Sequence, residues 1–140
     1  MKIANFDTDK SVLLIAELSA NHSGSLELAI ETIKAAKRAG ADAIKLQTYT
    51  ADSLTLNSKN DDFMIKGGLW DGYDLYSLYE EALTPREWHK KLFQVAEDEG
   101  LICFSSPFCN NDTDFLEQFN PPAYKIASFE VTDYDFVEHI

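Results

Sequence analysis

The sequence predicts an α/β protein that forms the N-terminal half of a (β/α)8 TIM barrel, with about four βα units over residues 1–140. Short apolar segments suited to buried strands alternate with longer segments of helical periodicity. The spacing of strand, helix, glycine and strand between Leu13 and Tyr49 is typical of a βαβ unit. Each apolar segment also ends in polar residues, as strands do at the edge of a parallel sheet that holds an active site.

Composition limits the class of protein. With 140 residues, of which 45% are hydrophobic and 26% are charged, the chain fits one globular domain. Its 12 Lys and Arg residues against 24 Asp and Glu residues give a net charge of -12, which argues against a nucleic acid partner. The start of the chain lacks an apolar signal-peptide core, and no apolar run is long enough to span a membrane, so we expect a cytoplasmic protein with no membrane partner. Cys103 and Cys109 lack metal-site spacing and are expected to be reduced, one of them in the core.

The first βαβ unit accounts for residues 13–49. The run LLIAELSANH from Leu13 predicts a buried strand followed by a loop. The next segment predicts a helix, with Ser25 as its N-cap, apolar residues close to a 3.6-residue period, and Gly40 as its stop. The second strand, AIKLQTY, then begins at Ala43.

The segment between Thr50 and Leu83 interrupts the alternation. A connection of this length in a compact unit is usually functional. We expect a lid, an oligomer contact or a short extra helix, the last at LYSLYEEAL. Its aromatic residues favour packing over a platform for a sugar ring, and they are Trp70, Tyr73, Tyr76 and Tyr79.

The next helix and strand follow directly. Thr84 and Glu87 predict a capping box, with Pro85 at the first helical position. The helix should end at Gly100, and the third strand, LICFSSPF, begins at Leu101.

The fourth unit completes the predicted half barrel. A short helix is expected around DTDFLEQF, and two prolines then separate it from a strand over Ala123–Glu130. The last residues, DYDFVEHI, begin a further helix. Half a barrel would leave one face of its sheet uncovered, so we expect the chain to be the front part of a longer barrel.

Polar side chains gather at the ends of all four predicted strands. Residues two apart on a strand share a face, and the strand ends of a barrel converge on one mouth. A bulge, or a strand that has ended by Ser128, is needed to bring Lys125 and Ser128 together. Lysines with hydroxyl donors suit a phosphate or carboxylate ligand, and carboxylates suit proton transfer or water activation. The predicted site residues are Glu17, Lys45, Gln47, Ser106, Phe108, Lys125, Ser128 and Glu130.

Several of these residues have alternative interpretations. Glu17 and Lys45 could pair across neighbouring strands as a structural salt bridge. His22 fits a positioning role and a loop-bracing hydrogen bond equally well, whereas His89 is expected on the surface. No pair of histidines has metal-ligand spacing, so no metal ligand is predicted in this chain. A strand-end lysine, Lys45 or Lys125, also fits a Schiff-base aldolase, and a non-catalytic binding fragment is the third alternative.

Four sequence blocks together resemble the sialic acid synthase family, whose members condense phosphoenolpyruvate with an N-acetylated amino sugar. The blocks are AELSANHSGSLELA, AGADAIKLQTY, FSSPF and PAYKIASFE, and they run through nearly the whole chain. The segment GLWDGYDLYSLYEEALTPREWH resembles the pseudaminic acid synthase branch, which uses a 6-deoxy diacetamido hexose and forms a nine-carbon nonulosonic acid. The N-acetylneuraminate and legionaminate synthases, which accept other amino sugars, are the alternative.

The resemblance implies roles for the predicted site residues. Gln47 and Phe108 would face the sugar, while Glu130 and Glu17 would transfer protons or orient the attacking water. Ser106 stands where the family more often has threonine, and the hydroxyl is retained. Four residues would hold the phosphate and carboxylate of phosphoenolpyruvate, namely Lys45, Ser106, Lys125 and Ser128.

The resemblance also implies parts that this chain does not contain. Family members have a complete barrel of about 250 residues, followed by an antifreeze-protein-like domain, and they form homodimers. A divalent metal, Mn or Mg, is held by two histidines on later strands and polarises the sugar aldehyde. We therefore expect no synthase activity from the 140-residue chain alone.

Overall fold

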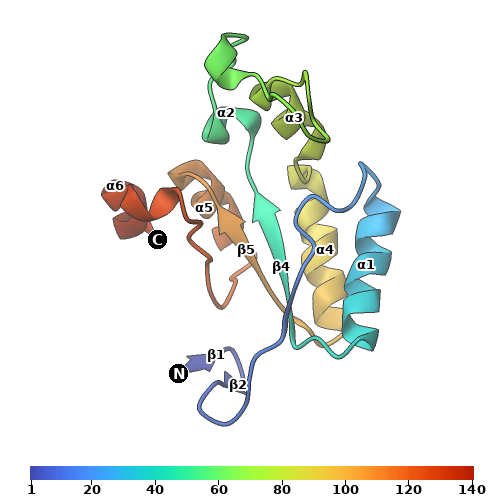
Figure 1. The fold of residues 1–140 in the computed structure, drawn as a ribbon. Helices are drawn as coiled ribbons and strands as arrows, with labels where there is room; N and C mark the ends of the chain where they lie inside the picture. Colours follow the sequence, from blue (N-terminus) through green and yellow to red (C-terminus); the bar gives the residue numbers. More distant parts are fainter.

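The computed structural model describes all residues from Met1 to Ile140 and contains a three-stranded parallel sheet with the order β3-β4-β5 (Figure 1). The strands are β3 (Ile15–Glu17), β4 (Ala43–Thr48) and β5 (Ile102–Pro107). The helices are α1 (Leu26–Arg38), α2 (Ala51–Leu54), α3 (Leu75–Ala82), α4 (Arg86–Asp98), α5 (Asn110–Glu117) and α6 (Tyr134–His139), with the 3-10 turns η1 (Asp61–Phe63) and η2 (Glu130–Thr132). Helices alternate with parallel strands, so the predicted α/β class is confirmed.

Helix α1 begins and ends where the sequence predicts. The Ser25 hydroxyl accepts a hydrogen bond from Leu28 N at 3.2 Å, which satisfies an amide that has no partner within the first turn. Gly40 follows the helix with a φ of 93°, a left-handed conformation that glycine adopts without steric cost. The turn at Gly40 brings the chain directly into β4.

Helix α4 begins without the predicted capping box, which is therefore wrong. Pro85 occupies the N-cap instead of the first helical position, and no side chain caps the helix. The buried Thr84 hydroxyl lies 3.3 Å from His22 Nε2. A tertiary contact thus uses the hydroxyl that the local sequence pattern assigns to the cap.

One face of the sheet packs against α1 and α4 to form the core. Cys103 lies in this core, and burial raises the pKa of its thiol to about 12, so the thiol stays protonated at neutral pH. The helices contribute Ala29 and Ile33 from α1 and Leu92 and Val95 from α4. The strand residues of this core follow the two-residue period of a strand, and they are Ala16, Leu18, Ile44, Leu46 and Cys103.

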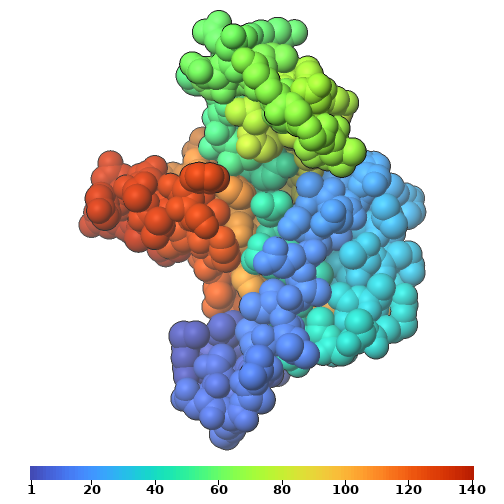
Figure 2. All heavy atoms as spheres, viewed as in Figure 1, coloured from blue at the N-terminus to red at the C-terminus, as the bar shows by residue number.

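The opposite face of the sheet holds the polar residues predicted for the site. The strand register places Glu17 beside Lys45 and, further along, Gln47 beside Ser106. Ile15, at the edge of this face, is 43% exposed. Figure 2 shows atoms of β4 and β5 at the centre of this view, between the blue N-terminal segment and the red C-terminal segment. In a barrel this is the face that lines the interior.

The fourth predicted strand, Ala123–Glu130, is wrong as a continuous strand. Its contact with β5 is a single parallel bridge between Ser105 and Tyr124, with Lys125 N donating to Ser105 O at 3.1 Å. The chain then leaves β5, Phe129 is 93% exposed, and Glu130 begins η2. Only β5 offers this segment a partner, and a strand with one neighbour and an unpaired outer edge gains few ladder hydrogen bonds.

An N-terminal hairpin is present that the sequence did not predict. Strands β1 (Lys2–Ile3) and β2 (Phe6–Asp7) pair antiparallel at the lower end of the molecule in Figure 1. Thr8 closes the hairpin by donating from its amide and its hydroxyl to Met1 O, each at 2.9 Å. Strands of two residues are too short to show a periodic pattern. Among the helices of the chain, none has the length and apolar character needed to cross a membrane.

Candidate active site

A cavity of about 550 Å³ lies at the carboxyl ends of β4 and β5. It brings together three of the predicted site residues, Gln47, Phe108 and Glu130. Gln47 comes from β4, Phe108 follows β5, and Glu130 begins η2. The segment after β4 supplies the other wall, with Leu54, Trp70, Leu78, Tyr79 and Ala82. The carboxyl end of a parallel sheet is where α/β enzymes bind their ligands.

Tyr49 is a residue of this cavity that the sequence analysis missed. It is 5% exposed, and its ring lies edge-on to Phe108 at 5.6 Å and to Tyr79 at 6.1 Å. Burial, helped by the neighbouring Tyr79, raises the pKa of Tyr49 to about 12, so its hydroxyl stays neutral at physiological pH. The sequence does contain an indication of this position, because Tyr49 lies two residues after Gln47 and residues two apart on a strand share a face.

Glu130 is the one residue with a buried side-chain oxygen or nitrogen that lacks a hydrogen-bond partner in the protein. Its Oε2 atom is buried and accepts no hydrogen bond. A buried carboxylate oxygen without a hydrogen-bond donor costs free energy of folding. A ligand or water that donates a hydrogen bond to this oxygen would recover that free energy. Since Glu130 also lines the cavity, its carboxylate is available to a bound molecule.

Lys45 and Glu17 form an ion pair, as in the alternative interpretation that these residues make a structural salt bridge. Lys45 Nζ lies 3.5 Å from Glu17 Oε1, and the side chains are 8% and 60% exposed. This distance exceeds that of a charge-assisted hydrogen bond, about 2.7–2.9 Å. An ammonium has three donors, so Lys45 keeps capacity for a second anionic partner on the same face of the sheet.

The remaining predicted residues do not line the cavity. Ser106 is 2% exposed and sits beside Gln47 in the strand register. Lys125 and Ser128 are exposed on the segment that runs past β5, and only the backbone of Lys125 is tied to the sheet. The structure therefore places the two predicted lysines in different environments, one buried in the sheet and one in solvent.

His89 is buried, so its predicted surface position is wrong. Its Nδ1 lies 3.1 Å from Pro85 O, an acceptor, so Nδ1 carries the proton and Nε2 accepts from the Thr48 hydroxyl at 2.8 Å. The Thr48 hydroxyl then accepts from Ser105 at 2.7 Å. The ring of Phe115 covers His89 edge-on at 5.1 Å. This chain of hydrogen bonds links α4 to β4 and β5 on the face opposite the predicted site.

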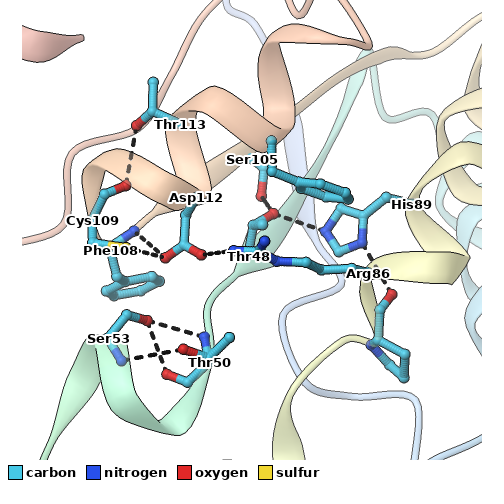
Figure 3. Close-up of polar contacts among 12 residues, drawn as sticks. Thr48, Thr50, Ser53, Arg86, His89, Ser105, Phe108, Cys109, Asp112 and Thr113 are labelled. Carbon is cyan, nitrogen blue, oxygen red and sulfur yellow. Dashed lines mark hydrogen bonds and ion pairs between the residues drawn. The ribbon is translucent and has the colours of Figure 1, made fainter.

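Asp112 lies in the first turn of α5 and holds the preceding residues, which include one residue of the cavity lining, Phe108. It is fully buried and accepts from Arg86 Nη2 at 2.8 Å (Figure 3). It also accepts from Phe108 N at 3.4 Å and from Cys109 Sγ at 3.3 Å. Because Asp112 binds the Phe108 amide, the Arg86 pair orients a residue that lines the cavity.

His22 makes the loop-bracing contacts that were one of its two interpretations. Its Nδ1 accepts from Gly24 N at 3.2 Å, so Nε2 carries the proton and donates to the Thr84 hydroxyl. The imidazole also lies edge-on to Trp88 at 5.3 Å. These contacts hold the loop after β3 against the start of α4.

Acid is expected to destabilise the protein through His89. Burial lowers the pKa of His89 below its ordinary value of 6.5. The unfolded chain then binds the proton more readily, so the stability linked to the neutral ring is complete above pH 6.5 and is lost as the pH falls below it. We expect the urea midpoint of the native gene product to drop between about pH 7 and about pH 5.5, and His89→Gln to reduce this drop. An equal drop in both proteins would contradict the assignment.

No group of three or more His, Cys, Asp or Glu side chains is arranged to hold a metal ion anywhere in the 140 residues. The divalent metal that the family resemblance implies would take its ligands from later strands, beyond these 140 residues. Lys45, Gln47, Tyr49 and Glu130 instead offer a cation, an amide, a neutral hydroxyl and a carboxylate. This set can bind an anion and a polyhydroxylated ligand and can accept a proton.

Comparison with known proteins identifies relatives of this chain. Pseudaminic acid synthase from Campylobacter jejuni subsp. jejuni serotype O:2 is 65% identical over 140 residues, which are 100% of this chain and 41% of that protein. Pseudaminic acid synthase from Helicobacter pylori is 54% identical over 125 residues, 89% of this chain and 37% of that protein. The crystal structure of N-acetylneuraminic acid (sialic acid) synthetase from Leptospira borgpetersenii in complex with citrate matches with a TM-score of 0.75 and 25% identity, over 91% of this chain and 40% of that chain.

The chain thus spans about two fifths of the length of the curated relatives that it matches. Its likeness to the N-terminal part of a sialic acid synthetase confirms the predicted partial barrel. A family model described as the NeuB family matches residues 32–140. Because this match covers most of the chain and agrees with the four sequence blocks, the chain belongs to the NeuB family.

Proposed function

We propose that the native gene product is a pseudaminic acid synthase. It would condense phosphoenolpyruvate with a 6-deoxy diacetamido hexose to give a nine-carbon nonulosonic acid, and release phosphate by C–O cleavage. The observation that carries the proposal is the 65% identity, over every residue of this chain, to a protein named pseudaminic acid synthase. The cavity at the carboxyl ends of β4 and β5 supports it, because its mostly apolar lining with two polar side chains, Gln47 and Glu130, suits an acetamido sugar.

The proposal assigns the anionic substrate to the interior face of the sheet. Lys45 is buried there and retains free donors, which supports a role in binding the carboxylate or phosphate of phosphoenolpyruvate. Ser106, one strand away, would donate its hydroxyl to the same anion. Lys125 and Ser128 are exposed, so they would complete this binding after a movement of residues 125–128 toward the sheet.

The carboxylates would serve the second half of the reaction. Carbon 3 of phosphoenolpyruvate attacks the sugar aldehyde, water adds at carbon 2, and phosphate leaves with the bridging oxygen. Glu130 would take a proton from the attacking water, because its Oε2 has no competing donor in the protein. Glu17 would orient that water from beside Lys45. Gln47 and Phe108 would face the sugar in the cavity.

The proposal includes parts that this chain does not provide. A divalent metal, Mn or Mg, would polarise the aldehyde with ligands from beyond these residues, and none of the roles given above depends on it. The native product would hold a complete barrel and an antifreeze-protein-like domain, and act as a homodimer in the cytoplasm.

Paired assays on the native gene product test the proposal. Phosphate release with phosphoenolpyruvate is expected to be at least about tenfold faster, in kcat/KM, with the 6-deoxy diacetamido altrose than with N-acetylmannosamine. In ¹⁸O-labelled water the label should enter the sugar acid and not the phosphate, which identifies C–O cleavage. The isolated 140-residue chain is expected to give no turnover.

Other outcomes favour other functions. Faster turnover with N-acetylmannosamine or the legionaminate precursor would identify a different synthase of the same family. A borohydride-trapped adduct on Lys45 or Lys125 would support the Schiff-base aldolase. Binding of phosphoenolpyruvate without phosphate release from any sugar would support a non-catalytic binding protein.

A further inference from the structure

The cavity at the carboxyl ends of β4 and β5 combines two polar side chains with a mostly apolar lining. Nine of its 11 lining residues are hydrophobic, and the other two are Gln47 and Glu130. These two polar residues come from β4 and η2, whereas most of the apolar wall comes from the segment between β4 and α4. A ligand in this cavity therefore meets an amide and a carboxylate within a lining that is mostly apolar.

Trp70 provides the outer part of the apolar wall, and its loop is fixed. An antiparallel bridge joins Met64 to Asp74, and Ile65 N donates to Tyr73 O at 2.9 Å. Inside this closed loop, Tyr73 N donates to Trp70 O at 3.0 Å, and the two rings lie edge-on at 5.9 Å. The loop leads into α3, where the Tyr76 hydroxyl donates to Asp52 at 3.1 Å. Hydrogen bonds within its own loop thus hold the indole at the cavity, and Trp70 takes no part in the core between the sheet and the helices α1 and α4.

Trp70 is 46% exposed although its loop is held by hydrogen bonds. About half of the indole surface lies open to solvent beside the cavity, so a ligand bound in the cavity can cover it. The unpartnered Oε2 of Glu130, which lines the same cavity, indicates that the cavity takes a ligand. A ring that completes the wall of a ligand cavity gains its contacts when the ligand binds.

We propose that Trp70 is a specificity-determining residue that selects an amino sugar with a methyl group at carbon 6 over one with a hydroxymethyl group. The inference rests on the proposed function and deepens it. A 6-deoxy diacetamido hexose has an apolar edge that the indole, Leu78 and Ala82 can cover, while Gln47 and Glu130 bind its polar groups. A hydroxymethyl group packed against the indole face, Leu78 and Ala82 would lose hydrogen bonds with water, and these carbon surfaces offer none in return.

The expected selectivity is moderate. An apolar pocket rejects a ligand that only adds a hydroxyl by no more than about 10²-fold. The selectivity is limited because binding of that ligand leaves no polar group of the protein unpaired. We therefore expect kcat/KM of the native gene product to favour the 6-deoxy sugar over its 6-hydroxy counterpart by about 10²-fold.

The test is Trp70→Ala in the native gene product, assayed with both sugars. We expect kcat/KM for the 6-deoxy sugar to fall about tenfold or more through KM, and the ratio between the two sugars to approach one. Trp70→Phe should restore most of the ratio, because a phenyl ring keeps the apolar surface. The matched control is Leu69→Ala, which removes an adjacent apolar side chain that is 87% exposed and does not line the cavity. This variant should leave both values unchanged.

Equal losses for the two sugars in Trp70→Ala would overturn the inference, as would an unchanged ratio. If the wild-type protein releases no phosphate with either sugar, the proposed function fails, and calorimetric titration of the two sugars then decides the inference. A binding preference for the 6-deoxy sugar that Trp70→Ala abolishes and Leu69→Ala keeps would support it. Absence of any sugar binding to the wild-type protein would refute it.

Discussion

Replacing Glu130 with glutamine is expected to lower kcat of the native gene product by about 10³-fold, within the range of general-base catalysis. The amide has the shape of the carboxylate but cannot take a proton from water. The Oε2 atom is buried without a partner, so no hydrogen bond of the folded protein is lost on replacement. KM for both substrates should change little, because the amide oxygen still accepts a hydrogen bond.

The control for this prediction is Glu138→Gln. Glu138 is an exposed glutamate of α6, and it carries no ion pair in the structure. The same loss of charge at that position should leave kcat unaltered. Steady-state phosphate release measures both variants. A Glu130→Gln enzyme whose kcat stays within about threefold of wild type would remove Glu130 from proton transfer.

Replacing Lys45 with methionine is expected to reduce kcat/KM for phosphoenolpyruvate by about 10²–10³-fold, the cost of removing a buried charged partner from an anion. Methionine keeps the length and apolar stem of the side chain in a position that is 8% exposed. The loss should appear mainly in KM for phosphoenolpyruvate, with KM for the sugar nearly constant, since the sugar cavity does not include Lys45.

This prediction separates the two interpretations of the Lys45–Glu17 pair. If Lys45 serves only as a partner for Glu17, the variant should lose stability and keep its kinetics. That loss would be less than about 1 kcal/mol, since the Glu17 side chain is 60% exposed and remains solvated. Lys66→Met is the matched control, because Lys66 is 69% exposed and pairs with Asp61 at 3.6 Å on the surface. Wild-type KM for phosphoenolpyruvate in Lys45→Met would establish the structural interpretation.

The parts of the fold that were predictable are those fixed by local chemistry. Ser25 and Gly40 mark the ends of α1 because a hydroxyl cap and a left-handed residue act within one helical turn. The strands β4 and β5 are buried runs flanked by turns, and their period follows from the backbone alone. The errors arise where a distant partner decides the outcome. Thr84 turns to His22 instead of capping α4, and His89 is buried because Thr48 and Ser105 offer hydroxyls from two strands.

The candidate site was predictable to a similar degree. Gln47, Phe108 and Glu130 meet in one cavity, as the convergence of strand ends predicts. Tyr49 and Trp70 were not assigned to it, because an aromatic residue has the same appearance in a sequence whether it fills a core or borders a ligand. The exposed position of Lys125 also depends on how far the segment after Tyr124 pairs with β5, which sequence periodicity does not report.

The alternation of residues along β4 has an evolutionary consequence. Leu46 and Thr48 secure the strand against the helices, whereas Lys45 and Gln47 face the other way. A substitution at Gln47 therefore leaves the packing of its two chain neighbours intact. The new side chain does not contact the core between the sheet and the helices, so it does not weaken that core. Under the proposed function, mutations at Gln47 that change which sugar is accepted are thus largely uncoupled from mutations that unfold the protein. Under the same proposal, a lineage built on this sheet can change the sugar that it accepts by single amino-acid steps, each of which passes through a folded intermediate.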